Sequence, residues 1–132
     1  MCQLFQAFAK EEKMKSILMV SGSRGYCCPE RVRSMVRRFS DKEWILIHGD
    51  CPDSPDGIAG EEAERLGMVV GKFPYVSSLG RAGGHVRNRA MVDMADMCLF
   101  FWDGESSGTG KTIEYAKASG KDHTVFRTQG VA

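Results

Sequence analysis

Residues 98–112 have the sequence CLFFWDGESSGTGKT, and this stretch decides the fold. Its first part, Cys98 to Trp102, is a nearly continuous apolar run, which is typical of a central parallel strand that is buried on both faces. A glycine-rich loop from Asp103 to Thr112 follows directly. A helix around residues 113–119 is expected next, with Gly120 as its stop. A strand, a glycine-rich loop and a helix together form one unit of an α/β domain.

The same alternation continues on both sides of this stretch. Four further strands are predicted at residues 16–20, 44–48, 68–73 and 123–127. Helices are predicted from Pro29 to Phe39, from Ile58 to Leu66 with a stop at Gly67, and from about Val86 onward. The sequence therefore predicts an α/β fold, a single three-layer domain with a mainly parallel sheet of about five strands. We expect this domain to span residues 15–132, after an N-terminal extension over residues 1–14.

The composition is that of a globular domain whose charges are balanced. The 132 residues include 18 Lys and Arg against 17 Asp and Glu, which gives a formal net charge of +1. This balance gives no general attraction to nucleic acid or to a membrane, so an anion must be bound at a local site. No apolar run reaches the roughly 18 residues that a membrane span needs. The opening residues do not resemble a signal peptide, and five cysteines without framework spacing fit a reducing, cytoplasmic environment.

Three glycine-containing loops follow predicted strands and so fall at one edge of the sheet. They are SGSRG at residues 21–25, HGDCPDSPDG at residues 48–57 and DGESSGTG at residues 103–110. Ligands of such sheets lie beyond the carboxyl ends of the strands. Glycine lets the backbone approach an anion closely, and the N–H groups of the following helices favour phosphate. Each loop alone would be an ordinary turn, but three at one edge predict a binding site.

Four segments, in this order and spacing, resemble the SLOG superfamily, and specifically its small YspA-like branch in bacteria and their phages. Residues 22–24 resemble its "GSR" motif, and residues 48–59 resemble its "HG…GAD..A" loop. Residues 80–91 resemble "G..AG..RN..M", and residues 101–109 resemble "F.DG.S.GT". Ser54 and Pro55 depart from this pattern, since the family often has Gly and Ala there.

The resemblance implies a Rossmann-like fold that recognises a nucleotide or a nucleotide-derived small molecule. Some relatives, the LOG enzymes, hydrolyse the N-glycosidic bond of nucleoside 5′-monophosphates, and others are nucleotide sensors in bacterial conflict systems. Three hypotheses follow: a nucleotide-binding protein, a nucleoside 5′-monophosphate N-glycosidase, and a phage or defence-related protein-interaction module. Relatives often form homodimers, so a homodimer is one expected state. No cofactor, no metal, no membrane and no nucleic acid is expected as a partner.

The predicted ligand-binding residues are glycines, hydroxyl groups and charged groups of these segments. Arg24 is expected either to pair with a phosphate or to cap its loop in solvent. Asp56 is expected either to accept a ribose hydroxyl or to cap a helix. The phosphate is expected where backbone donors, hydroxyls and a helix dipole converge at Gly108 and Thr109, with Lys111 adding charge. The full set is Gly22, Ser23, Arg24, Gly49, Asp56, Arg87, Asn88, Gly104, Ser106, Ser107, Gly108 and Thr109.

Catalysis depends on a carboxylate whose position differs from that in the LOG enzymes. Arg87 matches their functional arginine, but Thr112 stands where they have a glutamate. A carboxylate would stabilise the oxocarbenium ion or activate water in glycosidic cleavage. Arg87, Asp103 and Glu114 are the candidate catalytic residues, with Glu105 as a further substitute. A binding protein without chemistry is the favoured alternative.

Other patterns give weaker hypotheses. The string SGTGKT is not a P-loop, because Glu105 stands where that motif requires its first glycine, so a kinase or ATPase is excluded. Trp102 and Tyr75 are candidates for stacking on a base, with core packing as the alternative. A group of cysteines and histidines lacks compact zinc-ligand spacing, so metal binding is not expected. Its members are Cys27, Cys28, Cys51, His48 and His85.

Overall fold

Six strands form one sheet in the computed structural model, in the order β3-β2-β1-β4-β5-β6. The structure describes residues 15–41, 43–51, 53–75, 77–80, 82–127 and 130–131, so the expected extension over residues 1–14 lies outside it. The strands are β1 (Ser16–Gly22), β2 (Trp44–His48), β3 (Val69–Lys72), β4 (Met97–Trp102), β5 (Asp122–Arg127) and β6 (Gly130–Val131). The first five are parallel, and β6 runs antiparallel to β5. The predicted fold class is therefore confirmed.

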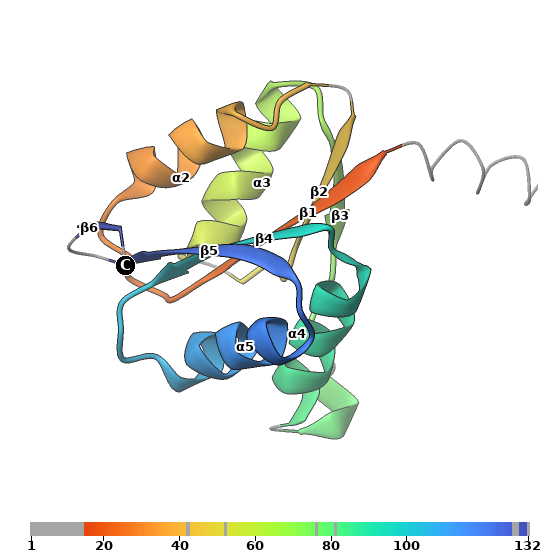
Figure 1. Cartoon of the computed structure of the whole chain (residues 1–132), viewed down its shortest axis with the longest axis vertical. Helices are drawn as coiled ribbons and strands as arrows, with labels where there is room; N and C mark the ends of the chain where they lie inside the picture. The colour runs from red at the N-terminus through yellow and green to blue at the C-terminus, as the bar shows by residue number, and fades with distance from the viewer. Residues whose placement is uncertain are drawn as a thin grey trace, which may run out of the picture.

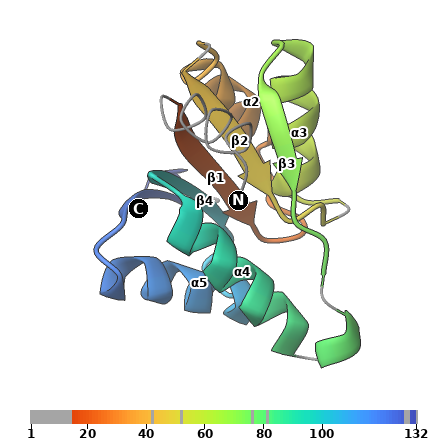
Figure 2. The same ribbon diagram turned by 90° about the vertical axis from the view of Figure 1, so that its right-hand side faces the viewer.

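Helices cover both faces of this sheet (Figure 1). They are α2 (Pro29–Arg37), α3 (Pro55–Arg65), α4 (Ala82–Met94) and α5 (Ser107–Ala118), together with a short 3-10 helix, η1 (Ser77–Leu79). Helices α2 and α3 lie on one face, and α4 and α5 lie on the other (Figure 2). Among the described residues, no helix is long and apolar enough to cross a membrane.

Alternating side chains of the central strands divide the core into two layers. Leu18 of β1 packs in the layer that includes Val32 of α2, whereas Met19 packs in the layer that includes Met91 of α4. This follows from the two-residue period of a strand, which sends successive side chains to opposite faces. Strand β4 lies between β1 and β5, and its four middle residues are buried, as the apolar run predicted.

Three helices begin earlier in the chain than predicted. Helix α3 begins at Pro55 rather than Ile58, α4 at Ala82 rather than Val86, and α5 at Ser107 rather than Ile113. Glycine, serine and threonine in these first turns favour loops on propensity, but tertiary packing overrides that preference. The predicted stops hold, since both Gly67 and Gly120 follow their helices with positive φ (78° and 70°).

The chain changes direction across the sheet at β1. The connection after β1 leads to β2 on one side, whereas β4 pairs with β1 on the other side after the chain has formed β2, β3 and α4. The loops that leave the carboxyl ends of β1 and β4 therefore diverge toward opposite faces. In open α/β sheets this switch point is where ligands bind.

Candidate functional site

A cavity of about 420 Å³ lies at the carboxyl ends of β1 and β4, at the switch point of the sheet. We call it the loop cavity. Loops after β1, β2 and β4 contribute to it, together with α4 and the first turns of α3 and α5. The residues that line it are Ser21, Gly22, Ser23, Arg24, Cys51, Asp56, Arg87, Asn88, Ser106, Gly108 and Thr109.

Ser23 ties the β1 loop to the end of β4. Its backbone N–H donates to the carbonyl of Phe101 (2.9 Å), and its Oγ accepts the N–H of Asp103 (3.2 Å). Asp103 Oδ1 in turn accepts the N–H groups of Glu105 (2.9 Å) and Ser106 (2.7 Å). These donors favour the charged carboxylate, so the Ser106 and Glu105 N–H groups lower the pKa of Asp103. Asp103 thus shapes the β4–α5 loop and does not line the loop cavity.

The first turn of α5 presents backbone donors to the loop cavity. The side chain of Ser106, at the N-cap, makes no capping hydrogen bond. Within the described chain, no acceptor takes the N–H groups of Ser107, Gly108 or Thr109. A Cβ added at Gly108 would meet nothing within 4 Å, so this glycine borders open space. Uncapped N–H groups beside a cavity are suited to an anion.

Arg87 reaches from α4 to the ends of β2 and β3. Its Nη1 donates to the carbonyls of Gly49 (2.6 Å) and Phe73 (3.0 Å), and its Nε donates to Oδ1 of Asn88 (2.6 Å). The other terminal nitrogen, Nη2, donates to no described residue. The guanidinium is thus held in place while part of its donor capacity stays available to a ligand.

A chain of hydrogen bonds continues from Arg87 to α5. Asn88 Nδ2 donates to Oγ1 of Thr112 (3.1 Å), and the Thr112 hydroxyl donates to the carbonyl of Gly108 (2.9 Å). Thr112 is buried, with 3% of its surface exposed. Thr112 therefore joins α4 to α5.

Asp56 is the buried carboxyl group of the loop cavity. Its Oδ2 accepts the N–H of Gly49 (3.0 Å), and 4% of the residue is exposed. Burial raises the pKa of Asp56 to about 6, against the opposing charge of Arg87 and the backbone donors. The helix-cap interpretation of Asp56 is wrong, because Ser54 is the N-cap of α3 and its Oγ accepts the Asp56 N–H (3.2 Å).

Two lining residues were absent from the predicted set. Ser21 is a buried polar residue near the end of β1, and Cys51 lies in the β2–α3 loop. Arg24 Nε donates to Cys51 Sγ (3.4 Å) across the two loops. A polar residue that ends a buried strand was the available signal for Ser21. Cys51 carried no such signal, because its neighbour Arg24 comes from a distant segment.

Several predicted residues lie elsewhere. Gly49 sits beneath Arg87, and Gly104 adopts φ 85° against Arg127. Ser107 lines a separate hollow beside Trp102, and Lys111, expected to add charge at the phosphate, lines that hollow and the groove between α4 and α5 instead of the loop cavity. Glu114 is exposed and lines that hollow and the groove between α4 and α5, not the loop cavity.

The aromatic candidates lie apart from the loop cavity, and of the cysteine–histidine group only Cys51 lines it. The Trp102 Nε1 donates to the carbonyl of Ser106 (2.9 Å), and the Arg127 guanidinium lies 5.0 Å from its ring centroid. The hydroxyl of Tyr75, which is half-exposed, donates to the carbonyl of Gly80. Among the described residues, no group of three or more His, Cys, Asp or Glu could hold a metal ion.

Comparisons with known proteins identify the fold. No protein-family model and no curated protein sequence matches the chain. Two solved structures of the Moco carrier protein from Chlamydomonas reinhardtii superpose with TM-scores of 0.65 and 0.68 at 16% identity. They cover 84% and 85% of this chain and 75% and 76% of that protein. DNA processing protein A from Streptococcus pneumoniae superposes with a TM-score of 0.70 at 17% identity, over 87% of this chain and 51% of that one. The chain therefore has the Rossmann-like α/β fold that these structures share.

Proposed function

We propose that the protein binds a phosphorylated small molecule, a nucleotide or a nucleotide derivative, in the loop cavity. One observation carries the proposal: Gly108 and Thr109 of the first turn of α5, whose N–H groups have no described acceptor, line the same cavity as Arg87. Backbone N–H groups at a helix start and an arginine fork are the donors that phosphate oxygens take.

The arrangement suggests how such a ligand would lie. The phosphate would accept from Gly108 and Thr109, while Arg87 Nη2 and Arg24 supply positive charge from the other side. Asp56 would face the sugar, whose hydroxyl groups donate to a carboxylate. A volume of about 420 Å³ falls within the ordinary range of small-molecule sites.

The structural neighbours support a small-molecule ligand. Two of them are structures of a protein that is named as a carrier of the molybdenum cofactor. The four SLOG-like sequence segments support the finer assignment to nucleotides and to the YspA-like branch. Segments 22–24 and 101–109 both contribute to the loop cavity.

An N-glycosidase is the second candidate, and one feature favours it. Asp56 and Arg87 line the same cavity, and the raised pKa of Asp56, about 6, suits a group that exchanges a proton near neutral pH. Asp56 would then supply the carboxylate that Thr112 does not. Asp103 and Glu114 are weaker candidates, because neither lines the loop cavity.

The test measures binding and turnover in the same samples. The purified protein is incubated with nucleoside monophosphates, NAD, ADP-ribose and cyclic nucleotides, and its melting temperature and the products by chromatography are recorded. A rise in melting temperature without turnover supports binding, by mass action. Free base released from a monophosphate, and lost in Asp56→Asn, supports the N-glycosidase. If the melting temperature does not change and no product forms, both candidate functions are overturned and the protein-interaction module is favoured.

A matched pair of variants locates the ligand. Gly108→Ala places a methyl group at the mouth of the α5 donors without a clash in the free protein, so it should weaken binding about tenfold or more while keeping the fold. Gly57→Ala, in α3, is the control, since its Cβ would meet only the Cys51 carbonyl at 3.9 Å. Equal affinity in the two variants would contradict the proposed phosphate position.

A further inference from the structure

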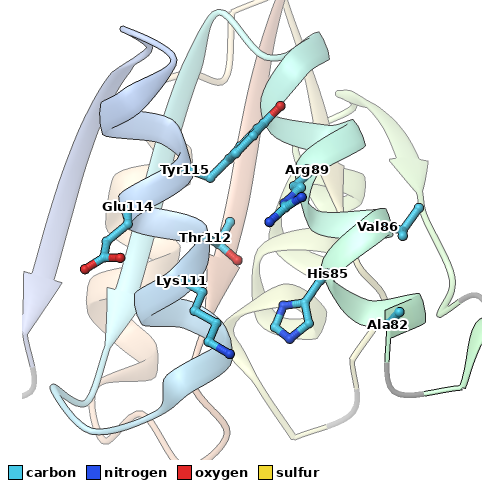
Figure 3. A pocket seen from close by; sticks show the side chains of 8 residues that line it. All are labelled: Ala82, His85, Val86, Arg89, Lys111, Thr112, Glu114 and Tyr115. Atoms are coloured by element: carbon cyan, nitrogen blue, oxygen red, sulfur yellow. The ribbon is translucent and has the colours of Figure 1, made fainter.

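A second cavity, of about 620 Å³, occupies the groove between α4 and α5 (Figure 3). We call it the α4–α5 groove. It adjoins the loop cavity through one hydrogen bond, because Asn88 lines the loop cavity and donates to Thr112, which lines the groove. A ligand that passes this contact would reach both spaces. The groove is the larger of the two, so the loop cavity need not contain the whole ligand.

Three basic side chains line this groove. His85 and Arg89 come from α4 and Lys111 comes from the second turn of α5, and all three point into the space between the helices (Figure 3). In the part of the chain that the structure describes, no acceptor pairs with the side chains of His85 or Lys111. Arg89 lies over the ring of Tyr115, 5.3 Å from its centroid, which leaves its charge uncompensated.

The nearby carboxylates do not neutralise the charges of Arg89 and Lys111. Glu114 also lines the groove, but its carboxylate is directed away from Lys111 and His85, toward the far side of α5 (Figure 3). Asp93 accepts the hydroxyl of Tyr115 at 2.7 Å, and that contact fixes the ring beneath Arg89. A hollow lined by uncompensated positive charge attracts anions, and an arginine can hold a phosphoryl group with two parallel hydrogen bonds.

We propose that the α4–α5 groove binds a second phosphoryl group, held by His85, Arg89 and Lys111, so that the ligand of the loop cavity carries two. This inference rests on the proposed function, because a single ligand spans both spaces. The ligand class is then a nucleotide with phosphoryl groups at two separate positions, such as a nucleoside bisphosphate. The first group lies at the α5 donors and the second lies beyond the Asn88–Thr112 contact.

An NMR titration of the full chain with inorganic phosphate, at constant ionic strength, tests each site separately. The His85 ring and the Arg89 Nε–H signals report on the groove, and the Gly108 and Thr109 amides report on the loop cavity. Both sets are expected to shift. In Lys111→Gln the groove signals should reach half of their full shift at a phosphate concentration about three- to fivefold higher, which is the ordinary effect of losing an exposed ion pair. The Gly108 amide should titrate as in the unmodified protein.

Lys117→Gln is the matched control, since Lys117 is an exposed residue of α5 that lines neither space. It removes the same charge and should leave both titrations unchanged. If Lys117→Gln weakened phosphate binding as much as Lys111→Gln, the change in net charge would explain both effects, and the groove would not be a specific site. Shifts of the loop amides alone would overturn the groove and leave the proposed function standing. Shifts of the groove signals alone would overturn the loop cavity as a phosphate site. If no signal shifted, both phosphate sites would be overturned.

A matched pair of ligands tests whether one molecule spans both spaces. AMP and adenosine 3′,5′-bisphosphate differ by one phosphoryl group. Lys111→Gln is expected to weaken binding of the bisphosphate by about three- to fivefold, as for the loss of an exposed ion pair, and to leave AMP binding unchanged. Equal weakening of the two ligands, or no weakening of either, would contradict a shared ligand.

Discussion

The guanidinium of Arg87 lies directly on the backbone of Gly49. Nη1 of Arg87 donates to the Gly49 carbonyl at 2.6 Å, and a Cβ built at Gly49 would lie 2.6 Å from Arg87 Cζ and 2.9 Å from Asp56 Oδ2. The contact joins α4 to the end of β2 and sets the position of the charge that faces the loop cavity. The absence of a side chain at residue 49 is therefore part of how Arg87 is held.

We predict that Gly49→Ala displaces Arg87 and lowers the free energy of unfolding by about 1–3 kcal/mol, through overpacking and the loss of charged hydrogen bonds. Urea denaturation measures this. In an Arg87→Ala background the same substitution should cost less, because the clashing group is gone. If the two effects simply added, the contact would carry no coupling energy and the prediction would be wrong.

Asp56 gives the protein a pH dependence of a definite sign. Burial raises the pKa of its carboxyl from 3.8 to about 6 in the folded state, so between these values the folded protein binds more protons than the unfolded chain. Its contribution to stability is complete below pH 3.8 and is lost as the pH rises through about 6. The loss is on the order of 2–3 kcal/mol.

Asp56→Asn should remove that dependence. The free energy of unfolding of the variant, relative to the unmodified protein, should rise between pH 4 and pH 6.5 and then stay level. Chemical denaturation at a series of pH values gives the difference curve. A flat curve would mean that the Asp56 carboxyl titrates alike in the folded and unfolded chains.

Glu62 should show the opposite sign. Its Oε2 accepts from Arg65 Nη2 (2.6 Å) and from Arg37 Nε (2.8 Å), and the hydrogen bond from Arg65, followed by that from Arg37, lowers its pKa from 4.5 to about 2. The folded protein therefore releases this proton more readily, and the stabilisation is present above pH 4.5 and lost as the pH falls toward 2. Glu62→Gln should be less stable at pH 7, with a deficit that shrinks below pH 4.5. A deficit that stays constant down to pH 2.5 would exclude the carboxylate charge as its source.

His48 and Gly60 form a tight contact in the layer between β2 and α3. The Nε2 of His48 is buried and has no partner among the described residues, and a Cβ at Gly60 would lie 2.5 Å from it. Because the Asp50 N–H donates to Nδ1 of His48 at 2.9 Å and so holds the ring in place, Gly60→Ala should cost about 1–3 kcal/mol of unfolding free energy. Gly57→Ala on the same helix should be neutral or slightly stabilising, since alanine favours a helix where there is space. Thermal denaturation of the two variants tests this, and equal melting temperatures would contradict a tight contact between His48 and Gly60.

The sequence predicted the features that depend on local pattern. The apolar run of β4 identified a central strand, and Gly67 and Gly120 marked helix ends, because burial and positive φ leave direct traces in residue type. Gly108 and Thr109 were also predicted at one sheet edge, since parallel strands end on the same side, whereas Arg87 and Asn88 were predicted from the family resemblance of residues 80–91.

Features that depend on packing between distant elements were not predictable. The early start of α5 at Ser107 is one example, since its glycines and hydroxyl residues favour a loop on propensity alone. The Asn88–Thr112 hydrogen bond is another, because it joins helices whose facing sides are fixed only by the whole fold. The same holds for the groove that gathers His85, Arg89 and Lys111.

The pairing of β1 with β4 has a consequence for the newly made chain. Leu18 lies opposite Met97, so β1 can complete its pairing only after β4 has been synthesised. The hydrogen bond between Ser23 and Asp103 can form only after Asp103 has also been synthesised. While the chain is being synthesised, residues up to β3 can assemble one half of the sheet, but no binding cavity exists before α5 has emerged. A fragment that ends before β4 would leave one side of β1 without its partner, and one that ends before α5 would lack the donors for an anion. Ligand binding would therefore distinguish finished molecules from incomplete ones, and a ligand present in the cell would stabilise only the former.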